Sequence, residues 1–98
     1  MAIVEISIIP LGTAHPSVGD YVARSLKVLK ESGLKYELTP MSTVIEGDLN
    51  EIFHILRKMH EASFNNKVKR VVTLIKIDDR RDKTTTMEEK VKSILEKI

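Results

Sequence analysis

The sequence predicts an α+β fold in which helices cover one four-stranded antiparallel sheet. Four β-prone runs, at about residues 2–9, 35–39, 43–46 and 70–78, are interspersed with three segments that have helical apolar spacing. The central segment 32–47, SGLKYELTPMSTVIEG, reads as strand, turn and strand between two helices, because Pro40 divides two β-prone runs. With 98 residues, the chain is expected to form a single domain over residues 1–98.

The first quarter of the chain predicts a strand followed by a helix. Apolar residues alternate along the strand at Ala2, Val4, Ile6 and Ile8. Pro10 and Gly12 are expected to end this strand, and residues 11–16 to form a loop. Ser17 is a favourable N-cap for a helix that ends near Gly33. The apolar positions of this helix are Val18, Val22, Leu26 and Leu29.

Two short strands, at about 35–39 and 43–46, lead into a second helix. Asp48 and Glu51 form an acidic capping box at its start, and Asn65 and Asn66 suit the turn that follows it. Its apolar positions are Leu49, Ile52, Phe53, Leu56 and Met59.

The last third of the chain predicts a strand, a charged loop and a third helix. The strand occupies about residues 70–78, and residues 78–83 form the loop. Thr86 and Glu89 cap the helix, whose apolar positions are Met87, Val91, Ile94, Leu95 and Ile98. The order β-α-β-β-α-β, with an extra C-terminal helix, is that of the ferredoxin-like split β-α-β fold.

One face of the predicted sheet is more apolar than a solvated face requires. Glu5, Ser7, Arg70 and Lys76 share it with four aliphatic residues, namely Ile3, Ile9, Val72 and Leu74. Such a patch is typical of an interaction site, so we expect another subunit to cover it. The alternative is that these are scattered surface aliphatics.

Composition excludes several classes of function. A net charge of +2 gives no electrostatic basis for binding nucleic acid or an anionic membrane. The last predicted strand has no aromatic residue on which an RNA base could stack. There is no cysteine, and the apolar opening is too short for a membrane span and lacks the features of a signal peptide, so a cytoplasmic location is expected.

The sequence contains no catalytic or metal-binding motif. His54 and His60 are six residues apart on a predicted helix, which places them on different faces, so no metal site is expected. His15 lies in a loop where it could reach a ligand or be an ordinary loop histidine. No nucleophile elbow, P-loop or dinucleotide fingerprint is present, so the chain is not expected to be an enzyme and needs no catalytic cofactor.

Polar side chains within the strands point instead to ligand binding. Glu46 precedes the second helix, where its carboxylate could accept from an amino group, balance a cation, or pair with a lysine at the sheet edge. Thr39 and Thr43 offer hydroxyl groups, although threonine is common in strands. Tyr36 could stack on a ring or only pack with its hydroxyl at the surface. The mixed-sign run 78–82 is either a solvated turn or a contact between subunits.

Three blocks of the sequence together resemble the small thiamine-binding-protein family. They are ISIIPLG (6–12), SGLKYELTPMSTVIEG (32–47) and RVVTLIKIDDRRDK (70–83), and the resemblance covers essentially the whole chain. It implies a ferredoxin-like fold, homo-oligomers that are commonly dimers of dimers, and binding of thiamine or its hydroxymethylpyrimidine moiety without catalysis. One departure is Ser42, where the family often has glycine.

The resemblance also implies a set of ligand-binding residues. These are Ser7, Pro10, Leu11, Gly12, Tyr36, Thr39, Met41, Thr43 and Glu46. Glu46 would meet the amino group or the cation, Thr43 and Ser7 the ring nitrogens, and Tyr36 or Met41 a ring face. The alternative function is a regulatory or structural homo-oligomer that has no thiamine ligand.

Overall fold

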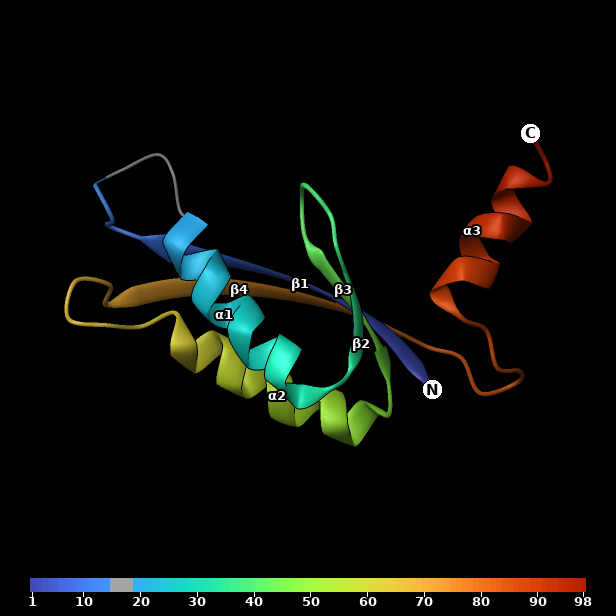
Figure 1. Ribbon diagram of the computed structural model, residues 1–98, viewed down its shortest axis with the longest axis horizontal. Helices are drawn as coiled ribbons and strands as arrows, with labels where there is room; N and C mark the ends of the chain where they lie inside the picture. The colour runs from blue at the N-terminus through green and yellow to red at the C-terminus, as the bar shows by residue number, and fades with distance from the viewer. Residues whose placement is uncertain (15–18) are drawn as a thin grey trace.

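The computed structural model, which describes residues 1–14 and 19–98, has the predicted ferredoxin-like order of elements (Figure 1). The elements are β1 (Ala2–Leu11), α1 (Gly19–Ser32), β2 (Lys35–Leu38), β3 (Thr43–Gly47), α2 (Leu49–Ala62), β4 (Arg70–Asp79) and α3 (Met87–Leu95). The sheet order is β2-β3-β1-β4, and all neighbouring strands are antiparallel. The predicted helix start at Ser17 and Val18, and the loop residue His15, lie outside the described residues.

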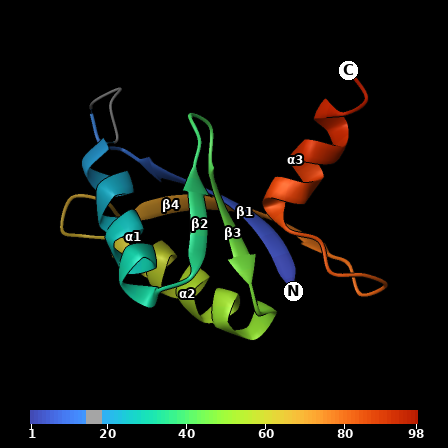
Figure 2. The same ribbon diagram turned by 45° about the vertical axis from the view of Figure 1, so that its right-hand side comes forward.

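Helices α1 and α2 lie side by side on one face of the sheet (Figures 1 and 2). Helix α2 packs against β1 and β3, and the buried core joins both helices to these strands. Its buried members are Val4, Ile6, Leu29, Ile45, Ile52, Ile55, Leu56 and Met59. The other face, which we call the open face, carries Glu5, Ser7 and Ile9 of β1.

The predicted apolar stripe of α2 is wrong at one position. Phe53 is 48% exposed, and Ile55 is buried instead. Ile52, Ile55 and Met59 recur at three- and four-residue intervals and therefore form one stripe toward the sheet. Phe53 is displaced from this stripe by one residue, about 100° around the helix.

Strand β1 is longer than the sequence predicts. Pro10 lies inside the strand, opposite Val71, and Leu11 lies opposite Arg70. The pairing of β1 with β3 ends earlier, at Ile6 opposite Thr43. Proline is tolerated in a strand where its missing N–H would point to an unpaired edge, and β1 has such an edge beyond Ile6.

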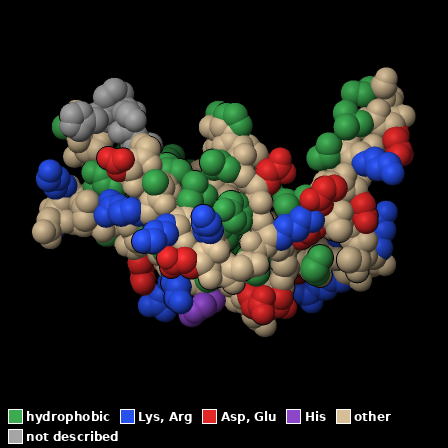
Figure 3. Space-filling model, in the orientation of Figure 1, with side chains coloured by type: hydrophobic (Ala, Val, Ile, Leu, Met, Phe, Trp, Pro, Cys, Tyr) green, Lys and Arg blue, Asp and Glu red, His purple; other side chains and the backbone are tan. Residues whose placement is uncertain are grey.

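Helix α3 projects from the rest of the domain (Figures 1 and 2). Thr86 and Glu89 form the predicted capping box at its start. The helix ends at Leu95, so Ile98 lies beyond it and not within it as predicted. Hydrophobic side chains gather along α3 (Figure 3). Its exposed hydrophobic residues are Val91, Ile94 and Leu95.

Strand β4 also exposes aliphatic side chains on both of its faces. Val72 and Leu74 are exposed on the open face, as predicted. Ile75 and Ile77 lie on the helix side, opposite the core residues Ile6 and Val4, yet are also exposed, because α2 packs against β1 and β3. Within residues 1–14 and 19–98, no helix has the length and apolar character needed to cross a membrane.

Candidate functional site

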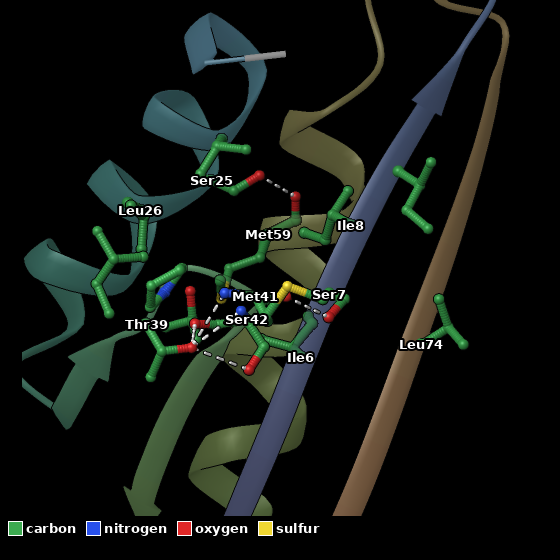
Figure 4. Close-up of a pocket in the computed structure, with 15 residues that line it drawn as sticks. Ile6, Ser7, Ile8, Ser25, Leu26, Thr39, Met41, Ser42, Met59 and Leu74 are labelled. Carbon is green, nitrogen blue, oxygen red and sulfur yellow. Dashed lines mark hydrogen bonds between the residues drawn. The ribbon is translucent and has the colours of Figure 1, made fainter. Parts of the chain in front are cut away.

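A pocket of about 410 Å³ lies beside β1 at the point where β3 begins (Figure 4). Its walls are the middle of β1, one side of α1 and the turn between β2 and β3, with contributions from α2 and β4. The lining residues are Ile6, Ser7, Ile8, Ile9, Val22, Ser25, Leu26, Leu38, Thr39, Pro40, Met41, Ser42, Thr43, Met59 and Leu74. Most are aliphatic, and the polar lining side chains are all hydroxyls. A small organic ring with a few polar atoms suits such a surface.

Thr39 fixes the turn that forms one wall of the pocket. Its N–H donates to the carbonyl oxygen of Ser42 at 2.9 Å, and its Oγ1 donates to the same oxygen at 2.8 Å. The N–H groups of Met41 and Ser42 approach that Oγ1 at 3.3 and 3.1 Å. Ser7 Oγ donates to the carbonyl oxygen of Met41 at 3.3 Å and so joins the turn to β1. The turn is therefore held on both sides.

The inner wall carries a buried pair of hydroxyls. Ser25 Oγ donates to the carbonyl oxygen of Met59 at 3.0 Å and lies 3.0 Å from Ser63 Oγ. Both serines are buried where α1 crosses α2. Their small side chains allow the two helices to approach, and Ser25 leaves room in the pocket that a larger residue would fill.

The pocket brings together four of the predicted site residues: Ser7, Thr39, Met41 and Thr43. Pro10 and Leu11 lie farther along β1, and Gly12 follows it. Tyr36 lies on β2 opposite the core residue Ile45, and neither it nor Glu46 lines the pocket. The ligand-binding roles assigned to all nine residues stay predictions.

Sequence reasoning missed the walls that α1 and α2 supply. Val22, Ser25 and Leu26 come from α1, and Met59 comes from α2. Leu38 and Leu74 were also missed as lining residues, although both are exposed aliphatics on strands. Ser25 interrupts the apolar spacing of α1, and this polar residue among aliphatics was the one available signal.

Glu46 lies in a second, separate cluster at the other end of β3. Its side chain is on the open face and only 4% of the residue is exposed. One carboxylate oxygen lies 2.8 Å from Lys35 Nζ, and the other accepts from the N–H of Met87 at 2.9 Å. Lys35 also contacts Glu88 at 2.6 Å. Pairing with a lysine, one of the alternatives left open by the sequence, is thus present.

The Glu46 cluster, defined as Glu46, Lys35, Met87 and Glu88, links the sheet to the first turn of α3. Hydrogen bonding to the Glu46 carboxylate, and then to Glu88, raises the pKa of Lys35 above its ordinary value. The same contact with Lys35 lowers the pKa of the Glu88 carboxyl. Both carboxylate oxygens of Glu46 already have partners. A ligand at Glu46 would therefore have to displace the Lys35 ammonium or the Met87 N–H.

Ser42 places another carboxylate near the pocket. Its Oγ donates to Glu5 Oε2 at 3.0 Å, and the other oxygen of Glu5 lies 3.8 Å from Lys76 Nζ. Ser42 therefore connects the turn to a half-exposed acidic group on the open face. A glycine at this position would lack that contact.

The charged run 78–82 forms ion pairs within itself and one with α3, between Asp78 and Lys90 at 2.8 Å. Arg80 pairs with Asp82, and Arg81 pairs with Asp79 at 2.8 Å. Hydrogen bonding to the Arg80 guanidinium lowers the pKa of the Asp82 carboxyl to about 2. These pairs are compatible with both interpretations of the run 78–82, a solvated turn and a contact between subunits. Among residues 1–14 and 19–98, no group of acidic and histidine side chains could hold a metal ion.

The element order and the strand order β2-β3-β1-β4 define a small ferredoxin-like domain. The chain belongs to the family described as Thiamine-binding protein, whose sequence profile matches residues 4–95. It is 50% identical to UPF0045 protein YqgV of Bacillus subtilis, over 96% of this chain and 94% of that protein.

Two crystal structures share the fold. Hypothetical protein MJ1052 of Methanocaldococcus jannaschii has a TM-score of 0.88 and 45% identity, covering 97% of this chain and 96% of that chain. A candidate thiamine biosynthesis/salvage protein of Thermotoga maritima has a TM-score of 0.79 and 26% identity, covering 95% and 97%. The predicted fold and family are confirmed.

Proposed function

We propose that this chain is a non-catalytic binding protein for thiamine or its hydroxymethylpyrimidine moiety. It would act in the cytoplasm as a homo-oligomer that carries, buffers or senses the ligand. The observation that carries the proposal is the pocket beside the β2–β3 turn, which gathers Ser7, Thr39, Met41 and Thr43 in one place. Membership of the thiamine-binding family supports the choice of ligand.

The pocket suits the pyrimidine half of thiamine better than the thiazolium half. Its lining residues include hydroxyls and aliphatic side chains but no carboxylate. A neutral aminopyrimidine needs a few donors and acceptors between apolar walls. A cationic ring is better placed near an acidic group, and Glu5 lies close by through its contact with Ser42. We therefore place the pyrimidine in the pocket and the thiazolium toward the open face.

Calorimetric titration with thiamine, its phosphates and hydroxymethylpyrimidine tests this proposal. Leu26→Trp inserts an indole into the pocket from α1, so we expect the dissociation constant to rise at least about tenfold, equivalent to about 1.4 kcal/mol. Lys27→Trp adds the same group to the exposed side of that helix and is the matched control. No heat with any of these compounds, from a folded protein, would reject the proposal.

Glu46→Gln in the same titration separates two placements of the ligand. If the ligand lies in the pocket, this variant binds about as tightly as the parent protein, since Glu46 does not line it. A large loss of affinity, with the fold intact, would place the ligand at the Glu46 cluster instead.

A second candidate is a regulatory or structural homo-oligomer without a thiamine ligand. The exposed aliphatic side chains on α3 and on the open face favour assembly. These surfaces are compatible with either candidate, because a binding protein can also be an oligomer. The titration above distinguishes the two.

Assembly through α3 has its own test. Leu95→Glu places a charge among the exposed aliphatics of α3, so we expect the oligomer to dissociate toward monomers in light scattering coupled to size-exclusion chromatography. Lys92→Glu changes charge one turn earlier and should leave the mass unchanged. An unchanged mass for Leu95→Glu would exclude α3 from the subunit contact.

A further inference from the structure

The pocket lies against a stretch of β1 that has a neighbouring strand on one side only. Strand β1 pairs with β4 along its whole length, from Ala2 to Leu11. Its pairing with β3 covers Ala2–Ile6 only. Beyond Ile6, the β3 side of β1 is open, and Ser7, Ile8 and Ile9 line the pocket there (Figure 4).

The register identifies which main-chain groups point to this open side. The N–H of Thr39 donates to Ser42, so these two residues form a hydrogen-bonded pair between the strands of the hairpin. Because such pairs alternate along an antiparallel ladder, Ser42, Val44 and Glu46 direct their N–H and C=O toward β2. Thr43, Ile45 and Gly47 therefore direct theirs toward β1.

The same alternation extends across β1. Ile6 and Val4 are opposite Thr43 and Ile45, so their N–H and C=O point to β3. Ile8 and Pro10 are the next members of this set. Proline has no N–H to leave unpaired, and its presence at this position agrees with the assignment. Ile8 thus presents both an N–H and a C=O to the open side, and no partner for them lies within residues 1–14 and 19–98.

An unpaired length of strand presents N–H and C=O groups that can pair with another strand or with a ligand of matching shape. In a hydrogen-bonded pair, each residue donates its N–H to the residue opposite and accepts from that residue's N–H through its own C=O. An aminopyrimidine offers the complementary groups side by side, an amino N–H and the adjacent ring nitrogen. The aminopyrimidine can therefore lie on the β3 side of Ile8, where a further residue of a paired strand would otherwise lie.

We propose that the N–H and C=O of Ile8 recognise the amino-substituted edge of the pyrimidine. The N–H donates to a ring nitrogen and the C=O accepts from the exocyclic amino group. Aliphatic side chains such as Leu26 and Met59 supply the apolar walls, and Ser7 positions the turn through Met41. This inference rests on the proposed function and adds the chemical basis of selectivity. It predicts that the pocket selects heteroaromatic rings with an adjacent donor and acceptor.

Three measurements on the full chain test the role of Ile8. Ile8→Pro removes the N–H that faces the pocket and leaves the ladder to β4 intact, since that ladder uses the alternate residues; it also replaces the aliphatic side chain. We expect its affinity for hydroxymethylpyrimidine to fall about tenfold, the cost of leaving one hydrogen-bonding group unmade. Ile8→Val keeps the main chain and should bind like the parent protein. The analogue without the amino group should bind the parent protein about tenfold more weakly.

Amide chemical shifts provide a readout that does not depend on a proline variant folding. On addition of hydroxymethylpyrimidine, the Ile8 amide proton should move downfield, while that of Val4, paired with Ile45, should stay in place. Binding with an unmoved Ile8 amide and undiminished affinity for the analogue would overturn this inference and leave the proposed function standing. Absence of binding by every compound would reject both.

Discussion

Replacing Glu46 with alanine is expected to lower the free energy of unfolding by about 2–3 kcal/mol. The change leaves the N–H of Met87 without its buried acceptor and removes the stronger partner of Lys35. Because the bond to Met87 holds the first turn of α3, the variant should also become sensitive to proteolysis within α3. Urea denaturation and limited proteolysis measure the two effects.

The control for Glu46 is Glu88, which contacts the same lysine from an exposed position. Glu88→Ala removes a solvent-screened ion pair and should cost much less than Glu46→Ala. Equal costs for the two variants would show that burial of Glu46 contributes nothing to stability. Intact protection of α3 in Glu46→Ala would contradict its role in holding the helix.

The pH dependence of the Glu46 cluster has a defined direction. The pKa of Lys35 is raised above 10.5 in the folded protein, chiefly by its hydrogen bond to Glu46. The contribution of Lys35 to stability is therefore complete below its unfolded pKa and is lost as the pH rises through the folded pKa. The lowered pKa of Glu88 has the opposite consequence: its contribution is present above 4.5 and is lost as the pH falls through the folded pKa.

Replacing Ile52 with alanine should be the more destabilising change, at about 2–5 kcal/mol. Ile52 is fully buried between α2 and the sheet, in contact with the core that includes Ile45. Phe53→Ala, at the next position of the same helix, is the matched control and should cost less than about 1 kcal/mol, since its side chain is half exposed. Thermal and urea denaturation of both variants check the difference. A larger cost for Phe53 would mean that another subunit covers it.

The order of elements was predictable because local signals agree along most of the chain. Pro40 separated two strands, and the pairs Asp48 with Glu51 and Thr86 with Glu89 marked helix starts that the structure retains. The end of β1 was not predictable from local signals. Whether Pro10 breaks a strand depends on which side of the strand has a neighbour, and only the sheet register determines that.

The site was partly predictable for a similar reason. Ser7, Thr39 and Thr43 are polar residues within β-prone runs, and Met41 was named through the family resemblance. Ser25 and Met59 belong to different helices, and their approach depends on how α1 crosses α2. For Glu46, the residue was predicted but its contacts were not. Its carboxylate was expected to meet an amino group, a cation or a lysine, but its partner Met87 is 41 residues away in the sequence, and no local pattern connects them.

Strand β3 contains a safeguard against misfolding that follows from the alternation of its side chains. Ile45 points into the aliphatic core, and its neighbour Glu46 points to the opposite face, where Lys35 and Met87 receive it. A slip of the strand by one residue would drive an ionised carboxylate among aliphatic side chains and turn an isoleucine out to water. Both changes raise the free energy of the same displaced state, so two adjacent residues disfavour an alternative register for β3, one of the two central strands of the sheet.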